Sequence, residues 1–393
     1  MGNNKHQNYQ ATTVRQSKKS KLLANTEIRR WYENLSRGSK ITADLRLQKM
    51  SKFCDQHQMT PLELAELGTK DKRTMTNMME DFVTSMKDRN MAPSYIQSIL
   101  TAVKSWLEHF EIRIERRIKV GDVNSTPTLQ DEKVPEPDEL AEMFSRANLR
   151  VAAIESLLSK AGLRPQVLGN DDATDGLMMK DLPDIVIQQG VVKCLQNPTM
   201  VTVRKNLSKA RHQYFTFLTP SGTQRLVAYL NDRLVKGDVL NAESAVIAPD
   251  RDHRYGRCNN KDKKFLPTKQ ITDLVRESFR PRFSWRPYVL RAYFDTQLLI
   301  AESKGKIAHD FRAFFMGHKG SIEAKYTTNK QRLPESLLNE MLESFKRCEE
   351  FLDIEVKKHD TILDRKEQLH QIISNATPEK VQEMLRVLGV CNT

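Results

Sequence analysis

Cysteine is scarce in this chain of 393 residues, which has only five, and they lie far apart. They are Cys54, Cys194, Cys258, Cys348 and Cys391. No two of them form a CxxC pair, so the sequence predicts neither a zinc site nor a disulfide framework. This usage is typical of a reducing compartment, and we therefore expect a cytoplasmic protein.

Long apolar runs are also missing. No stretch approaches the roughly 18 apolar residues that a membrane span needs, and the N-terminus has no apolar signal core. A myristoyl anchor at Gly2 is not expected, because His6 stands where that signal requires Ser or Thr. We therefore expect no membrane partner.

Acidic residues are in deficit relative to basic ones. The 63 Lys and Arg against 50 Asp and Glu leave a formal net charge of +13. This excess favours a polyanionic partner, because each neutralised phosphate releases condensed counterions. Nucleic acid fits best, although acidic lipid or ribosomes also attract basic proteins. The acidic cluster Asp171, Asp172 and Asp175 lacks EF-hand spacing, which predicts a solvated turn and not a metal site.

The first third of the chain predicts a basic arm followed by a helical domain. Residues 1–25 contain five Lys or Arg and no acid, which predicts a disordered arm along DNA or a solvated tail. From 26 to 120 apolar residues recur at helical spacing, as at Ile96, Ile99, Leu100 and Val103. We expect four or five short helices, including helices near 28–37, 41–57, 72–87 and from 94 onward.

Residues 121–137 contain three prolines and few apolar residues, which predicts a linker. The domain expected at 138–335 is mixed. Strands are predicted at 185–192, 200–203 and 213–218, and helices at 221–234, 268–279, 288–302 and 308–316. Residues 336–393 are expected to form a helical tail for docking or oligomerisation. The predicted fold class is α+β and mainly helical.

The candidate chemistry lies in ordered motifs of the second domain. Cutting and rejoining a DNA phosphodiester without a metal requires a nucleophile, cations around the phosphate and an acid for the leaving oxygen. A GLR tripeptide is followed by a predicted strand hairpin, an LRxxFxT segment, a GH dipeptide and a tyrosine in KYTTNK. The residues of these motifs are Gly162, Leu163, Arg164, Leu290, Arg291, Phe294, Thr296, Gly317, His318 and Tyr326.

This ordered set resembles the signature of tyrosine recombinases, and the sequence around the motifs is similar to that of archaeal integrases from viruses or mobile elements. The resemblance implies a SAM-like helical core-binding domain followed by a mixed α/β catalytic domain. It implies site-specific DNA integration or excision through a 3′-phosphotyrosine intermediate. It also implies that no metal and no nucleotide cofactor are used.

The resemblance assigns a role to each motif residue. Tyr326 would be the nucleophile, and Arg164 and Arg291 would hold the phosphate with help from His318. Lys209, in the turn of the predicted hairpin, would protonate the leaving oxygen, and Lys205 is the alternative. Tyr288 stands where the common bacterial form has His; a tyrosine can donate a hydrogen bond there but cannot act as a base at neutral pH.

The predicted partner is double-stranded DNA containing attachment sites. The residues expected to contact DNA are Arg204, Arg211, Arg254, Arg257 and Lys319. The basic loop 251–264 suits backbone contacts, with a disordered charged loop as its rival. The resemblance implies a tetramer on DNA, and we expect a monomer or weak oligomer when the protein is free. The short spacing from His318 to Tyr326 leaves delivery of Tyr326 in cis or in trans open.

Two alternatives belong to other classes. A type IB topoisomerase-like enzyme would use the same tyrosine chemistry but religate the same strand. A non-catalytic DNA-binding protein descended from an integrase is the second. The HxxR formed by His309 and Arg312 lies too close to His318 to supply the second arginine, so Arg312 is expected to be a phosphate contact or a surface charge.

Overall fold

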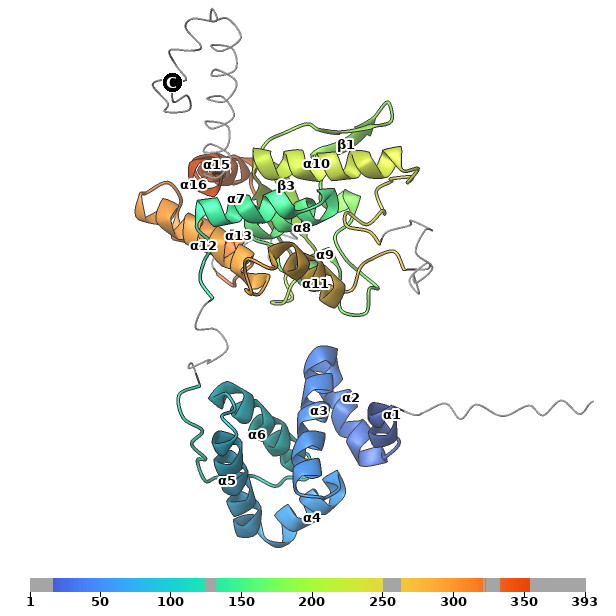
Figure 1. Cartoon of the computed structure of the whole chain (residues 1–393), viewed down its shortest axis with the longest axis vertical. Coiled ribbons are helices and arrows are strands. Elements are labelled where there is room, and N and C mark those ends of the chain that lie inside the picture. Colours follow the sequence, from blue (N-terminus) through green and yellow to red (C-terminus); the bar gives the residue numbers. More distant parts are fainter. Residues whose placement is uncertain (1–16, 124–131, 250–262, 321, 323–332, 354–393) are drawn as a thin grey trace, which may run out of the picture. The chain divides into compact units, whose positions relative to one another are not determined.

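The computed structural model describes residues 17–123, 132–249, 263–320, 322 and 333–353. The chain divides into two compact units, Met1–Gln130 and Asp131–Thr393, which are described separately (Figure 1). The division falls inside the segment 121–137 that the sequence predicts as a linker. Within the described ranges, every helix is too short or too polar to cross a membrane.

The first unit is helical from Lys18 to Glu108, with short connections between its helices. Its helices are α1 (Lys18–Leu23), α2 (Thr26–Gly38), α3 (Lys40–Gln56), α4 (Pro61–Lys70), α5 (Lys72–Asp88) and α6 (Pro93–Glu108). The predicted helical spans are confirmed to within a residue or two. Helix α4 begins with a capping box, in which Thr60 and Glu63 satisfy each other's backbone N–H groups. Trp106 of α6 is fully buried, packs edge-on against Trp31 at 5.4 Å and donates to the Pro61 carbonyl at 2.7 Å.

Helix α1 differs from the predicted disordered arm. Residues 18–23 are helical, with Ser17 as the N-cap, whereas residues 1–16 of the predicted arm lie outside the described residues. Lys18 pairs with Asp55, and Lys19 pairs with Asp44. A helix of this length is unstable alone, so the ion pairs with the two aspartates of α3 help to stabilise it. The composition of residues 1–25 gives no sign of these pairs.

The second unit combines helices with two antiparallel hairpins. Its helices are α7 (Pro137–Arg146), α8 (Leu149–Ser159), α9 (Pro165–Leu168), the 3-10 helix η2 (Met179–Asp181), α10 (Pro220–Val235), α11 (Thr268–Phe279), α12 (Tyr288–Ser303), α13 (His309–Phe315), α15 (Glu335–Lys346) and α16 (Glu349–Leu352). Its strands are β1 (Ile185–Gln188), β2 (Val191–Cys194), β3 (Thr199–Val203) and β4 (Tyr214–Leu218). The predicted α+β, mainly helical class is confirmed.

The single strand predicted at 185–192 is wrong. Strands β1 and β2 pair with each other, with Ile187 opposite Val192. Gln189 and Gly190 form the turn, and both have positive φ (53° and 75°). A two-residue turn of this kind makes a tight hairpin, so the chain reverses at Gln189 and Gly190, between two short apolar runs. The other hairpin pairs β3 with β4, as expected.

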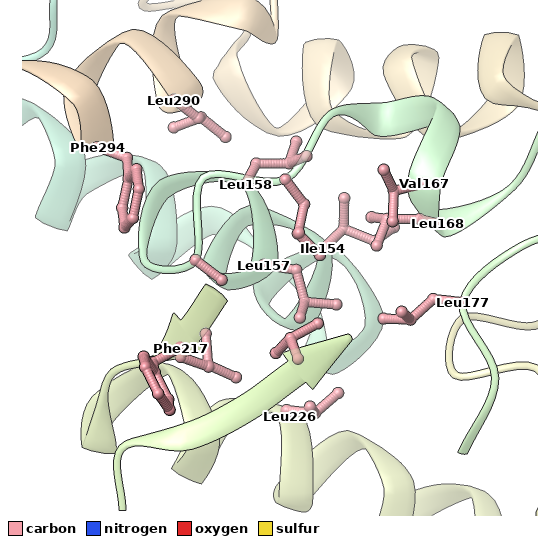
Figure 2. Close-up of a cluster of buried hydrophobic side chains, with 14 of the residues drawn as sticks. Ile154, Leu157, Leu158, Val167, Leu168, Leu177, Phe217, Leu226, Leu290 and Phe294 are labelled. Carbon is pink, nitrogen blue, oxygen red and sulfur yellow. The ribbon is translucent and has the colours of Figure 1, made fainter. Parts of the chain in front are cut away.

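Helix α8 is the centre of the second unit's core. Its residues Ile154, Leu157 and Leu158 point toward neighbouring elements on several sides (Figure 2). Leu226 of α10 and Phe294 of α12 pack against this cluster. The buried residues of α8 also include the polar Glu155, Ser156 and Ser159, so the helix is enclosed on more than its apolar side. The GLR tripeptide follows closely after the end of α8. Packing of α8 in the core therefore fixes the position of the turn that carries Arg164.

Helices α15 and α16 belong to the core of the second unit, in contrast to the separate tail predicted from 336. Met341, Phe345, Cys348 and Leu352 are fully buried in the same cluster as α8. The Phe345 ring lies 5.4 Å from that of Phe217. The sequence showed their apolar face but not its partner, because the surface that covers it comes from distant segments. Residues 354–393 of the predicted tail lie outside the described residues.

Glu155 of α8 gives the unit a predictable pH dependence. The carboxyl group is fully buried, and Ser278 donates a hydrogen bond to it at 2.6 Å. Burial raises the pKa of Glu155 to about 8, although Ser278 and Arg225 partly oppose the shift. The folded state therefore retains a proton that the unfolded state releases near pH 4.5, so stability falls as pH rises from about 4.5 to about 8.

Glu155→Gln is expected to flatten this pH dependence. The amide keeps the acceptor for Ser278 and carries no charge, so the variant should match the wild type near pH 5 and melt at a higher temperature at pH 9. Thermal unfolding of both proteins from pH 5 to pH 9 measures the effect. Parallel pH profiles would show that Glu155 does not titrate as described.

Candidate active site

The turn after α8 carries Arg164. Gly162 has φ of +64°, and the Phe294 ring fills the space that a side chain at this position would occupy. The Leu163 N–H donates to the Leu157 carbonyl at 3.1 Å and closes the helix end. Arg164 is half-buried and is the N-cap of α9, with Pro165 following. Position 162 therefore requires glycine, because of both its positive φ and the close packing of Phe294.

Arg291 joins this turn to a second one. The residue lies in the first turn of α12 and is only 1% exposed. One terminal nitrogen, Nη1, donates to the Gly162 carbonyl, and Nη2 donates to the Met316 carbonyl at 2.5 Å. Arg291 thus connects the turn that carries Arg164 to the turn that carries His318. Its Nε is buried and has no acceptor among the described residues.

The second turn follows α13. Gly317 has φ of +62°, and the His318 N–H donates to the Ala313 carbonyl at 3.0 Å. The ring of Tyr214, the first residue of β4, occupies the space beside Gly317 where a Cβ would lie. His318 itself is exposed, so its imidazole is presented at the surface above a buried tyrosine.

The charges of these residues act on one another. Burial lowers the pKa of Arg291, and the nearby Arg164 lowers it further. The pKa of His318 is lowered by burial first, then by Arg291 and Arg164. Burial also raises the pKa of Tyr214, and both arginines oppose that shift. Arg164, Arg291 and His318 therefore form one site of positive potential, with Tyr214 beneath it.

Three other arginines of this unit are neutralised by carboxylates. Arg204, Arg233 and Arg312 all pair with aspartates at 3.0 Å or less. In the part of the chain that the structure describes, no carboxylate pairs with Arg164 or Arg291. Two neighbouring guanidinium groups without a counterion repel each other, and a bound anion would relieve that repulsion.

Tyr288 lies at the edge of this site. It is the first residue of α12 and is 52% exposed. Its hydroxyl group is near enough to Arg291 to raise the pKa of that guanidinium. The sequence-predicted residues Arg164, Tyr288, Arg291 and His318 are thus brought together from three segments.

The two candidate lysines lie on the loop between β3 and β4. Both Lys205 and Lys209 are exposed. Gln166 of α9 donates to the Leu207 carbonyl of this loop at 3.5 Å, so the loop lies against the helix that Arg164 begins. Neither lysine is among the largest contributions to the pKa of Arg291 or His318. The geometry does not choose between them.

The expected DNA contacts have different surroundings. Arg204 uses its guanidinium inside the protein, bonding Asp175, Asp181 and the Gly176 carbonyl. Arg211 and Lys319 are exposed. The predicted nucleophile Tyr326 and the predicted contacts Arg254 and Arg257 lie outside the described residues.

Two structural expectations need correction. Arg312 is neither a surface charge nor available to a phosphate, because it bonds Asp295 and Glu302 and so fastens α13 to α12. Asp175 is not in a merely solvated turn, because it accepts two hydrogen bonds from Arg204. Within the described ranges, no group of three His, Cys, Asp or Glu side chains could hold a metal ion.

Sequence reasoning missed Tyr214 and the two carbonyl acceptors of Arg291. Tyr214 was visible only as the start of an aromatic strand, and burial against a glycine cannot be read from that pattern. The Gly162 and Met316 carbonyls leave no sequence signal, because every residue has a carbonyl. The glycines at 162 and 317 were the available clue, because a glycine next to a motif residue is typical of a turn that needs a positive φ.

No family model and no curated protein matches the chain. The XerA recombinase crystal structure is 17% identical, with 81% of this chain and 97% of that chain covered and a TM-score of 0.32. A lambda integrase (75–356) dimer bound to a COC′ core site is 15% identical, covers 79% and 97%, and has a TM-score of 0.43. An integrase from mycobacterium phage Brujita is 13% identical, covers 82% and 91%, and has a TM-score of 0.35.

Proposed function

We propose that the protein is a tyrosine recombinase that cleaves and rejoins DNA at specific sites through a 3′-phosphotyrosine intermediate. One observation carries the proposal. Arg291 bonds the carbonyls of two turns, and these turns present Arg164 and His318 around a site that lacks a carboxylate counterion among the described residues. The order of the GLR, LRxxFxT, GH and Tyr motifs along the chain supports the same assignment.

The chemistry of this site suits a phosphodiester. A guanidinium group donates paired hydrogen bonds to phosphate oxygens and does not lose its proton at physiological pH. The pKa of His318 is lowered by burial and by the nearby Arg291 and Arg164, and its imidazole can donate a hydrogen bond to a phosphate oxygen. Arg291 is nearly buried, so it acts by holding both turns and by its positive potential.

The proposed reaction is a transfer of the phosphoryl group between oxygens. The phenolic oxygen of Tyr326 attacks phosphorus and releases its proton to water, the bond to the 5′ oxygen breaks, and the ammonium group of Lys209 or Lys205 gives a proton to that oxygen. The product is a 3′-phosphotyrosine and a free 5′-hydroxyl. Attack by a different 5′-hydroxyl reverses the step and exchanges strands. Developing charge on the phosphate is stabilised by Arg164, Arg291 and His318.

The first unit offers a basic strip that suits the DNA backbone. Arg46, Lys49 and Lys52 recur every three residues on α3, which places them along one face. Arg46 donates to the Ser105 hydroxyl at 2.9 Å and Lys52 to the Tyr95 hydroxyl at 2.6 Å, so α6 borders this strip. The aspartates of α3 are occupied by α1. We propose that this strip contacts phosphates as the core-binding surface.

Covalent trapping on DNA tests the proposed function. A duplex pool with a nick near the cleavage position releases a short strand after cleavage, so the reverse step is prevented. Candidate attachment sequences in such duplexes should give adducts that survive denaturing detergent and form in EDTA. Strong binding to DNA without any adduct would favour a non-catalytic protein. Efficient relaxation of supercoiled plasmid lacking a site would favour the topoisomerase alternative.

Lysine substitutions should identify the general acid. Lys209→Ala is expected to slow cleavage by about 100-fold to 10,000-fold, whereas Lys205→Ala should have a small effect. A substrate with sulfur at the 5′ bridging position needs no proton to leave, so it should restore the rate of the Lys209 variant. The opposite pattern would transfer the role to Lys205. A rate that sulfur does not restore would argue against either as the acid.

The proposed assembly is a tetramer on two DNA sites, with a monomer or weak oligomer in the absence of DNA. Sedimentation of the protein with and without paired sites measures both states.

Mixing a Tyr326→Phe protein with one that carries Arg164→Ala tests whether Tyr326 acts in its own protomer or in a neighbouring one. Activity of the mixture would indicate delivery in trans, and continued inactivity would indicate delivery in cis.

A further inference from the structure

A buried lysine stands directly before the turn that carries Arg164. Lys160 is the C-cap of α8 and is fully buried. Its Nζ donates to the Leu352 carbonyl, lies 3.5 Å from Asp353 Oδ1 and lies 5.3 Å from the centroid of the Tyr293 ring. Removing an ammonium group from water is unfavourable unless such partners compensate it. The end of α16 therefore supplies a hydrogen-bond acceptor and a counterion for the buried ammonium group.

Asp353 also accepts hydrogen bonds from the start of α10. Its carboxylate accepts from the Thr219 hydroxyl at 2.8 Å, from the Ser221 hydroxyl at 2.7 Å and from the Ser221 N–H at 3.4 Å. Thr219 is the N-cap of α10, a position where a negative charge is favoured by the helix dipole. The Lys160–Asp353 pair thus joins α8, α10 and α16.

This ion pair lies behind both halves of the arginine site. Two residues after Lys160, the Gly162 carbonyl accepts the hydrogen bond from Arg291. Two residues after Arg291, the Tyr293 ring contacts Lys160, and its hydroxyl donates to the Leu352 carbonyl at 3.4 Å. Helices α12 and α16 pack against each other, and α15 lies beside α16 (Figure 1).

The aromatic contact of α15 acts on the same turn. Phe345 lies 6.3 Å, between ring centroids, from Phe294. Phe294 in turn fills the space beside Gly162. Helix α15 therefore contacts the Gly162 turn indirectly, through Phe294. Helix α16 is connected to the same turn through Lys160.

We propose that Lys160 and Asp353 are positioning residues for strand cleavage. Their ion pair docks α16 and so holds the Gly162 turn and α12 at the separation at which Arg164 and Arg291 act on one phosphate. Neither side chain touches the DNA. This inference rests on the proposed function, because it assigns these residues to the cleavage step and not to folding alone.

The test compares three variants with a matched control. Asp353→Asn and Lys160→Met each leave one buried charge without its partner, and the double variant removes both charges. Each single variant is expected to lower the single-turnover rate constant of adduct formation by about 10-fold to 100-fold, because small displacements of catalytic groups have effects of this size. The double variant also lacks the ion pair, so it should be about as slow as the single variants and not slower by the product of their losses, and DNA affinity should change by less than about threefold in all of them.

Leu140→Ala is the control, since Leu140 is fully buried in α7 of the same unit. It should lower the melting temperature while leaving the rate constant of the folded protein unchanged. Hydrogen exchange of peptides covering residues 160–168 gives a readout that does not depend on cleavage. Exchange there should rise in the single charge variants and not in Leu140→Ala.

The outcomes separate the two proposals. A wild-type rate constant for Asp353→Asn, or equal rate losses in Asp353→Asn and Leu140→Ala, would overturn the positioning role. Unchanged exchange at 160–168 in the charge variants would overturn it as well. If the wild-type protein forms no adduct on any DNA while exchange responds as expected, the cleavage function fails and the ion pair is only structural.

Discussion

Arg291→Lys is expected to lower the rate constant of adduct formation by about 100-fold to 1,000-fold. Lysine retains the charge, but its single nitrogen cannot reproduce the two diverging hydrogen bonds to the Gly162 and Met316 carbonyls. The turns that carry Arg164 and His318 would then lose their common connection. DNA affinity should fall much less, since the other basic residues proposed to contact the backbone are unchanged. Quench-flow cleavage and equilibrium binding measure the two effects separately.

Arg312→Lys is the matched control for this prediction. Arg312 lies on α13 within the same unit and is partly buried, and like Arg291 it makes several hydrogen bonds, in its case to Asp295 and Glu302. Its replacement should lower stability while changing the rate constant of folded protein by less than about tenfold. Equal losses in the two variants would mean that Arg291 matters only for folding.

Tyr326→Phe is expected to give the largest effect, a loss of adduct formation of at least about 10,000-fold, below detection in ordinary gels. Phenylalanine lacks the oxygen that would bond to phosphorus and otherwise keeps the shape of the side chain. Binding to DNA should remain within a few-fold of the wild type. Denaturing gels with end-labelled nicked duplexes measure the adduct.

Tyr288→Phe is the control for the loss of a hydroxyl group. Tyr288 is exposed beside Arg291, so its hydroxyl can donate to a phosphate oxygen without being the nucleophile. We expect a rate reduction of less than about tenfold. Adducts at wild-type levels from the Tyr326 variant, together with their loss in the Tyr288 variant, would reassign the nucleophile.

Much of the fold was predictable because its helices have strong apolar periodicity. Helices α3, α5, α11 and α12 begin and end within one or two residues of the predicted spans. Local signals failed where a partner came from far away in the sequence. Helix α1 depends on Asp44 and Asp55, and α15 depends on Phe217 and Phe294. Neither dependence is visible in the segment that it stabilises.

The sequence selected candidate site residues but gave no indication of how their segments meet. Motif order selected Arg164, Arg291 and His318, which the fold brings together. The burial of Arg291 and its use of two carbonyls could not be foreseen, because they depend on how two turns approach one helix. Arg204 illustrates the opposite problem, since an arginine in a basic loop resembles a DNA contact until its aspartate partners are located.

The covalent bond to DNA is the central claim, and mass spectrometry of a trapped complex tests it most directly. Wild-type protein trapped on a nicked duplex would be treated with nuclease and trypsin, which should release residues 326–330 as YTTNK. The account predicts a nucleotide remnant attached through its 3′ phosphate to Tyr326. A remnant on another residue, or a trapped complex that leaves no remnant at all, would contradict it.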